Sequence, residues 1–183
     1  MLMEYRKLVV TDIAWTAVAV GVAVAARAQV LSYQAPALLQ ERSFYGNLRV
    51  VEADGRRMLI HGIISHGTQF LDAEKKGMPT AYYAQGTGVE RAIEARRRTG
   101  ERVGIIGLGV GTIAAYGKRG DFYRFYEINP RVLALAESQF TFLKDSEAEI
   151  STVIGDGRLS LEREPEQNFD VLVIDAFSGD SVP

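Results

Sequence analysis

Three acidic side chains stand where short apolar strands are expected to end. Glu127 and Asp175 take the last position of such strands, and Asp156 follows a third strand between two glycines. Since the carboxyl ends of neighbouring parallel strands meet at one edge of a sheet, we expect the three carboxylates to share a crevice. A carboxylate there carries a desolvation cost unless it meets a cation or a proton donor. The pattern predicts a pocket for a hydroxyl-rich, positively charged ligand.

A glycine-rich turn precedes these acids in the chain. Gly107, Gly109 and Gly111 follow an apolar run, and such glycines allow a tight turn and a close backbone approach to a ligand. The G-x-G-x-G spacing is more usual for S-adenosyl ligands than for dinucleotides. Glu127, 20 residues beyond Gly107, could accept hydrogen bonds from both ribose hydroxyls. Taken singly, each feature has a simpler explanation. The glycines could form an ordinary chain turn, Glu127 could be an exposed acid at a strand end, and Asp156 could belong to a tight turn.

Short apolar strands alternate with helical patterns in this part of the chain, which is typical of a parallel sheet covered on both faces. We therefore expect an α/β, Rossmann-like fold of the class I S-adenosylmethionine type over residues 79–183. Complete sheets of this type usually hold further strands, so we expect the domain to be truncated at its C-terminal side. The expected elements are strands at Val103–Gly107, Phe122–Glu127, Ser151–Ile154 and Val171–Asp175, and helices from Val89, at Thr112–Lys118 and at Pro130–Phe140.

A smaller β unit is expected over residues 44–78. Asp54-Gly55 is a strong hairpin signal between the runs Asn47–Ala53 and Arg56–Ile64, and the second run continues to Leu71. The glycines at 62 and 67 suggest bulges in that second strand or the close approach of another backbone. The two histidines, His61 and His66, would then point to opposite faces of one strand, which argues against a chelating pair.

Residues 1–43 form an apolar segment followed by a linker. The uncharged run Ile13–Ala26 falls short of the roughly 20 residues that span a bilayer. Three interpretations stay open: the remnant of a membrane region, a signal peptide with a small-residue site around Ala26, and an amphipathic or buried helix. Pro36 breaks the pattern, and the stretch to Ser43 is expected to be a linker.

Composition excludes several classes of function. The chain has 183 residues, of which 47% are hydrophobic and 24% charged, and its formal net charge is -2. These values fit a globular protein and argue against a nucleic-acid partner, which usually requires a basic surplus. The chain contains no cysteine, so disulfides, thiolate catalysis and zinc–thiolate sites are excluded.

Several motifs occur in the order found in one known family. They are RSFYGNLRVVE, HGIISHGTQF, PTAYY, VGIIGLGVGT, RFYEINP, GDGR and VLVIDAFSGDSVP, which together cover nearly all of residues 42–183. This pattern resembles the spermidine-synthase-like polyamine aminopropyltransferases, in particular the branch fused behind transporter-like membrane helices. The resemblance implies decarboxylated S-adenosylmethionine as donor, methylthioadenosine as product and an amine such as putrescine as acceptor, with no metal. It also implies a cytoplasmic location, membrane association through the N-terminal segment as an alternative, and a homodimer.

The resemblance assigns the nucleoside end of the site. Gly107, Gly109 and Gly111 would form the nucleoside loop. Glu127 would bind the ribose, and Asp156, with Gly157, the adenine.

It also assigns the amine end. Asp175 would be the catalytic carboxylate, with Asp180 as a second acid. Gln69 would contact the donor or product at the entrance, and Tyr82 or Tyr83 would line the amine channel. Asp175 could hold the ammonium, accept or relay its proton and align the nitrogen for attack.

Two positions depart from the family pattern. Its glycine loop commonly carries an Asp that anchors the donor's aminopropyl ammonium, where this chain has Val110, and its two acids stand three positions apart rather than at Asp175 and Asp180. A class I methyltransferase that uses S-adenosylmethionine therefore remains an alternative hypothesis. A non-catalytic nucleoside-binding module is the third.

Overall fold

The computed structural model describes residues 15–28, 30 and 37–176, and the chain divides into one unit over Met1–Pro36 and another over Ala37–Pro183. In the first unit, residues 15–28 are helical, with exposed apolar side chains such as Trp15 and Val22. Among the described residues, no helix is both long and apolar enough to cross a membrane. The expected branch with fused membrane helices gains no support from this part of the chain.

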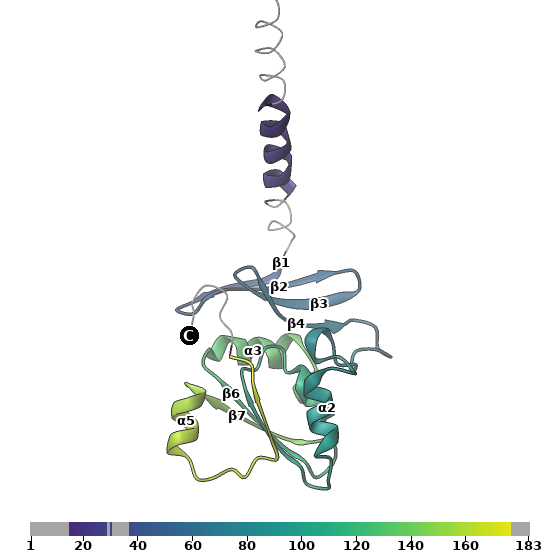
Figure 1. Ribbon diagram of the computed structural model, residues 1–183, viewed down its shortest axis with the longest axis vertical. Coiled ribbons are helices and arrows are strands. Elements are labelled where there is room, and N and C mark those ends of the chain that lie inside the picture. The colour runs from purple at the N-terminus through teal and green to yellow at the C-terminus, as the bar shows by residue number, and fades with distance from the viewer. Residues whose placement is uncertain (1–14, 29, 31–36, 177–183) are drawn as a thin grey trace, which may run out of the picture. The chain divides into compact units, whose positions relative to one another are not determined.

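The second unit begins with a four-stranded antiparallel sheet, here called sheet A, in the order β1-β2-β3-β4 (Figure 1). Its strands are β1 Ala37–Ser43, β2 Gly46–Ala53, β3 Arg56–His61 and β4 Ile64–Phe70. The Asp54-Gly55 hairpin is confirmed: both residues have positive φ, 50° and 69°, as a tight two-residue turn between twisted strands requires.

Two expectations for this region were wrong. The stretch to Ser43, expected to be a linker, is strand β1, whose residues pair with β2. The run expected to continue to Leu71 as one strand is broken by a second turn, where Gly62 has a φ of +59° and its N–H donates to the carbonyl of Asn47. A left-handed glycine reverses the chain there, so β3 and β4 are antiparallel neighbours.

The rest of the unit is built on a parallel sheet, sheet B, in the order β7-β6-β5-β8. Its strands are β5 Arg102–Ile106, β6 Phe122–Glu127, β7 Glu149–Ile154 and β8 Val171–Ile174. All three strand pairs are parallel. The expected α/β, Rossmann-like class with a separate N-terminal β unit is confirmed.

Helices flank sheet B, and some of them differ from the expected ones. The region expected to be helical at Thr112–Lys118 is a short 3-10 helix, and the helices at Phe142–Asp145 and Gly157–Arg163 were not predicted from the sequence. The helix after β6 begins as expected, with Pro130 in its first turn and the Asn129 side chain accepting from the N–H of Arg131. The elements are η1 Ala81–Tyr83, α2 Gly88–Ala95, η2 Thr112–Tyr116, α3 Pro130–Gln139, α4 Phe142–Asp145 and α5 Gly157–Arg163.

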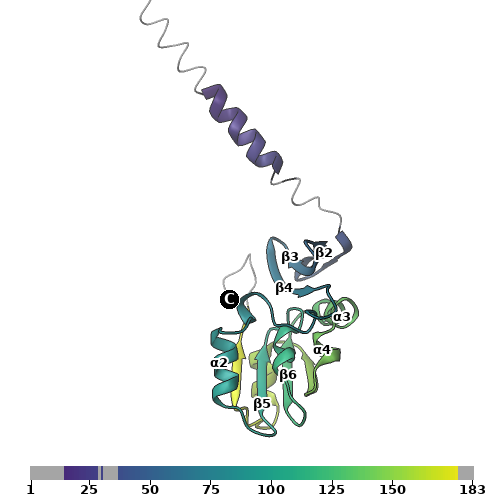
Figure 2. The same ribbon diagram turned by 90° about the vertical axis from the view of Figure 1, so that its right-hand side faces the viewer.

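The two faces of sheet B are covered to different extents, since one carries the core and the other leaves Leu172 and Ile174 of β8 44% and 72% exposed. Ile105 belongs to the buried core, whereas the next residue, Ile106, lies against Gly157 at the start of α5. Because successive strand side chains alternate between faces, α5 lies on part of the face opposite the core. The core itself joins both sheets, since Leu48 and Leu59 of sheet A share one cluster with Ile105. Two views show sheet A over the carboxyl ends of the parallel strands (Figures 1 and 2).

Candidate functional site

The carboxyl ends of the parallel strands meet at one edge, where the predicted site residues begin. The N–H of Gly107 donates to the carbonyl of Tyr126 at 2.8 Å, and the N–H of Asp175 donates to that of Ile106 at 2.8 Å. On the other side, the N–H of Gly155 donates to the carbonyl of Glu127 at 2.9 Å. These bonds continue the sheet ladders past the strand ends and fix the four chain segments side by side.

The glycine loop has the backbone that its sequence predicts. Gly107, Gly109 and Gly111 have φ values of +95°, +55° and +81°, a region that L-residues with side chains rarely adopt. A β-carbon on Gly107 would collide with the carbonyl of Asp175, and one on Gly109 with the carbonyl of His66. The loop is therefore held between β4 on one side and the segment after β8 on the other.

Glu127 braces this loop from the next strand. Its Oε2 accepts from the N–H of Leu108 at 3.0 Å, and its Oε1 accepts from the N–H of Asn129 at 2.9 Å. Burial raises the pKa of the Glu127 carboxyl, and these bonds and the nearby His61 oppose that rise. Each oxygen keeps a further lone pair, so the ribose contact stays a prediction that these bonds permit.

Asp175 lies against Tyr82 and Tyr83, the two tyrosines that the resemblance assigned with it to the amine end. The Tyr83 hydroxyl donates to Oδ2 of Asp175. The Tyr82 ring lies 4.5 Å from the Tyr83 ring, centroid to centroid, and Asp175 also raises the pKa of the Tyr82 hydroxyl, after burial as the larger cause. Burial, followed by the bond to Asp175, raises the pKa of Tyr83 as well, so both phenols stay protonated. A carboxylate beside aromatic rings is a suitable environment for an ammonium group.

The remaining predicted residues have varied positions. Asp156 is exposed and caps α5, because its side chain accepts from the N–H of Leu159 at 2.9 Å. Gly157 is the first residue of α5, and a β-carbon added to it would collide with the side chain of Ile106. Asp180 lies outside the described residues.

Gln69 is buried and its amide group is already engaged. It donates to the hydroxyl of Thr141 at 2.9 Å and to the carbonyl of Lys76 at 3.0 Å, and it accepts from the N–H of Thr141 at 3.0 Å. These bonds tie β4 to the start of α4 and to the loop after β4. A direct contact with donor or product remains a prediction, to be set beside this structural role.

The two histidines lie together at the site, which the sequence analysis missed. The expectation that they point to opposite faces of one strand was wrong, since His61 ends β3, His66 lies on β4 and their ring centroids are 5.2 Å apart. The glycine after His61 was the available signal in the sequence, because Gly62 supplies the turn that separates the two histidines. Among the described residues, no group of three or more potential ligand side chains could hold a metal ion.

Val110 stands at the centre of the glycine loop but faces away from solvent. Its side chain is 1% exposed and packs on Gly67 of β4, where a β-carbon would collide with a Val110 methyl group. The loop therefore presents no charged side chain at this position. Where the family pattern has an Asp, this chain therefore has a buried valine that packs on Gly67.

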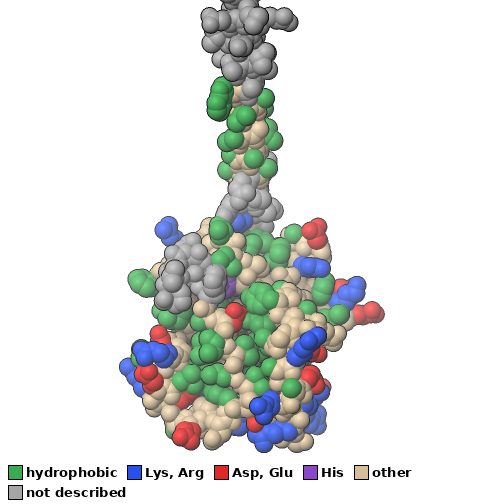
Figure 3. Space-filling view, viewed as in Figure 1, with side chains coloured by type: hydrophobic (Ala, Val, Ile, Leu, Met, Phe, Trp, Pro, Cys, Tyr) green, Lys and Arg blue, Asp and Glu red, His purple; other side chains and the backbone are tan. Residues whose placement is uncertain are grey.

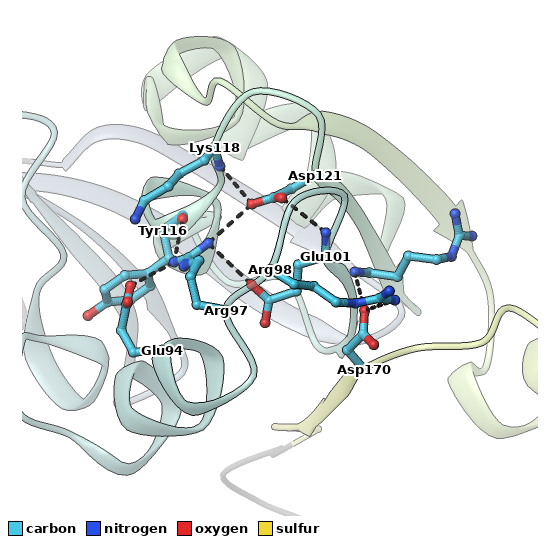
Figure 4. A network of polar contacts seen from close by, with 9 residues as sticks. Glu94, Arg97, Arg98, Glu101, Tyr116, Lys118, Asp121 and Asp170 are labelled. Atoms are coloured by element: carbon cyan, nitrogen blue, oxygen red, sulfur yellow. Dashed lines mark hydrogen bonds and ion pairs between the residues drawn. The ribbon is translucent and has the colours of Figure 1, made fainter.

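A second cluster of charged groups lies at the opposite edge of sheet B (Figure 4). Arg97 contacts the carboxylates of Glu94, Glu101 and Asp121 at 2.7, 3.2 and 3.1 Å. Glu101 and Asp121 precede strands β5 and β6, so they mark the amino ends of the parallel strands. Burial raises the pKa of the fully buried Glu101. These ion pairs connect α2 to the amino ends of β5 and β6, which indicates a structural role.

Charges on the molecular surface are mixed in sign. On the face shown in Figure 3, the Lys and Arg side chains alternate with Asp and Glu side chains around a hydrophobic centre.

No protein-family model and no curated protein matches the chain. Solved structures are similar to it in fold. A probable spermidine synthase from Corynebacterium glutamicum ATCC 13032 matches 81% of this chain with a TM-score of 0.58 and 16% identity, and spermidine synthase from Thermotoga maritima matches 76% with a TM-score of 0.54 and 16% identity. The matches span 55% and 46% of those two chains, so this chain corresponds to about half of their length. The chain thus has a spermidine synthase-like fold, with an antiparallel N-terminal sheet and a parallel sheet in the order 7-6-5-8.

Proposed function

We propose that this chain carries the catalytic site of an aminopropyltransferase, which moves an aminopropyl group from decarboxylated S-adenosylmethionine to an amine such as putrescine. The observation that supports it most directly is the contact between the Tyr83 hydroxyl and the Asp175 carboxylate at the carboxyl edge of sheet B. This contact fixes an acid next to the glycine loop, at the point where the two substrates would meet.

The nucleoside end of the donor would bind along the loop. The glycine loop lets the backbone approach the ligand, and Glu127 is held beside it by the bond from Leu108. Asp156, exposed at the start of α5, is free on its solvent side to accept from the adenine amino group. A site of this kind binds the product methylthioadenosine through the same contacts.

The acceptor would bind at Asp175. An alkylammonium, with a pKa of about 10 by analogy with lysine, arrives protonated and must lose a proton before its nitrogen can attack. The nitrogen lone pair then forms a bond to the methylene carbon beside the sulfonium. The carbon–sulfur bond breaks with its electron pair on sulfur, which leaves neutral methylthioadenosine and a secondary ammonium. Asp175, oriented by Tyr83, holds the incoming amine in line with that bond.

A methyltransferase that uses S-adenosylmethionine is the second candidate, and Val110 is the observation that favours it. Because this residue is buried on Gly67, the loop offers no carboxylate to the terminal ammonium of a decarboxylated donor. The two candidates differ in the donor that the site prefers.

Calorimetry with decarboxylated S-adenosylmethionine, S-adenosylmethionine and methylthioadenosine separates these functions. We expect the decarboxylated donor and methylthioadenosine to bind and to raise the melting temperature, since a ligand of the native state stabilises it. We expect Asp175→Asn to abolish aminopropyl transfer while nucleoside binding is kept, and Glu166→Gln, an exposed acid away from the site, to change neither. Normal transfer by Asp175→Asn would refute the catalytic assignment, and a failure of all three ligands to bind would refute both enzymes.

A further inference from the structure

His66 lies on the segment of β4 that crosses the glycine loop. Its carbonyl faces Gly109, and on the other side of the loop the carbonyl of Asp175 faces Gly107. The loop is thus flanked by the two segments that carry His66 and Asp175. The imidazole belongs to the same edge of the sheet as the proposed amine site.

The His66 ring has a hydrogen-bonding capacity that is not met. Its Nε2 is buried and has no hydrogen-bond partner among the described residues. The neighbouring His61 differs, because its Nε2 already contacts the carbonyl oxygen of Tyr45 at 2.5 Å. Buried polar atoms without a partner are rare in native proteins, and one beside a binding site suggests a group that a ligand completes.

Two titratable groups act on this imidazole, His61 from β3 and Asp175 from the segment after β8. The glycine loop packed against it adds no charge. Burial is the largest influence and lowers the pKa of His66, His61 lowers it further, and Asp175 opposes both. At neutral pH the ring is therefore uncharged, and one of its nitrogens is an acceptor. The Asp175 charge would stabilise the imidazolium that forms when this nitrogen takes a proton.

Asp175 is less suited to remove that proton itself. Its Oδ2 already accepts from the Tyr83 hydroxyl. The imidazole of His66, by contrast, has a buried nitrogen without a hydrogen-bond partner among the described residues, and a neutral ring has one nitrogen that can accept a proton.

We propose, on the basis of the aminopropyl-transfer function above, that His66 is the proton acceptor for the attacking amine. In this step the neutral imidazole takes one proton from the acceptor ammonium, whose nitrogen then holds a free lone pair. That lone pair forms the new carbon–nitrogen bond as the carbon–sulfur bond breaks toward sulfur. Asp175 holds the ammonium and stabilises the imidazolium, which returns its proton to solvent after the products leave.

The test is the pH dependence of single-turnover aminopropyl transfer in the wild type, His66→Gln and His66→Ala. A base acts in its unprotonated form, so the wild-type rate rises with pH through the pKa of His66. His66→Gln should lose this rising limb and about 10²- to 10⁴-fold of the rate, the range typical of general acid–base groups. Added imidazole should restore part of the rate of His66→Ala but none of that of Asp175→Asn. Ser65→Ala, an exposed neighbour on β4, should keep the wild-type profile.

Binding of methylthioadenosine, measured by calorimetry for each variant, separates the outcomes. Binding should be unchanged in the His66 variants. If His66→Gln keeps the wild-type rate and rising limb, the proposal is overturned while the transfer function stands. If both His66 variants lose nucleoside binding, the histidine instead holds β4 on the loop, and the proposal is equally overturned. If the wild type binds the nucleoside but transfers no aminopropyl group, the proposed function fails, and the role of His66 fails with it.

Discussion

Glu127 has a structural role, and its removal is expected to destabilise the fold. Its two oxygens accept from the N–H groups of Leu108 and Asn129, which belong to residues 5% and 2% exposed. In Glu127→Ala both donors lose their acceptor. A buried donor left without a partner costs about 1–3 kcal/mol, so two give a loss of about 2–6 kcal/mol.

The lower end of this range is the better expectation. Burial of the Glu127 carboxylate is itself unfavourable, as its raised pKa indicates, and the substitution removes that cost. A loss of about 2 kcal/mol in a chain of this size lowers the melting temperature by about 4–8 °C. Glu127→Gln keeps one carbonyl acceptor and should lose about half as much.

Thermal and urea unfolding measure this loss, with Glu137→Ala as the control because the side chain of that exposed acid on α3 has no hydrogen bond or ion pair with any described residue. The pH dependence gives a second readout. A carboxyl whose folded pKa is raised contributes stability below its unfolded pKa, and this contribution is lost as pH rises through the folded value. Wild type should therefore lose stability relative to Glu127→Gln as pH rises across that window. A melting temperature of Glu127→Ala equal to that of Glu137→Ala would refute the bracing role.

Two other substitutions test the packing around the site and the opposite edge of the sheet. Arg97→Ala leaves the fully buried Glu101 without its cation and should lower stability by about 3–5 kcal/mol in urea unfolding, whereas Arg98→Ala, which removes an exposed ion pair, should change it little. Equal urea midpoints for Arg97→Ala and Arg98→Ala would contradict the stabilising role of the Arg97 ion pairs. Gly109→Ala should lower both stability and methylthioadenosine affinity, because its β-carbon meets the β4 backbone, whereas Gly120→Ala carries a similar positive-φ strain in open space and should spare binding. If both glycine variants lost methylthioadenosine affinity, backbone strain alone would explain the loss, and the contact of the loop with β4 would not be needed.

The sequence was sufficient for features whose cause is local. Asp54-Gly55 specifies its turn through the positive φ of two adjacent residues. The alternation of apolar strands and helices specifies a parallel sheet, and a parallel sheet brings the ends of its strands together. That is why the positions of Glu127 and Asp175 at one edge of the sheet followed from the pattern.

Features that depend on pairing between distant segments could not be predicted in the same way. Strand β1 has no distinct strand pattern in its sequence. The alternating burial of its side chains depends on β2, with which it pairs. Helix α5 begins at Gly157 with Asp156 as its N-cap, and an Asp between two glycines fits a turn as well as a helix cap. The pairing of His61 with His66 could be predicted only if the turn at Gly62 was recognised first. The chain reverses at that turn, which makes these two residues neighbours.

The glycine loop shows why a glycine motif is weak evidence of a ligand. Gly107 and Gly109 are required here by the protein itself, because the carbonyls of Asp175 and His66 occupy the space of any β-carbon. The same spacing would be needed if no ligand ever bound. A stronger indication of function comes from polar groups that the fold leaves incomplete, and at this edge of the sheet the buried Nε2 of His66 is such a group. The chemistry of the site is therefore better tested at His66 and Asp175 than at the glycines between them.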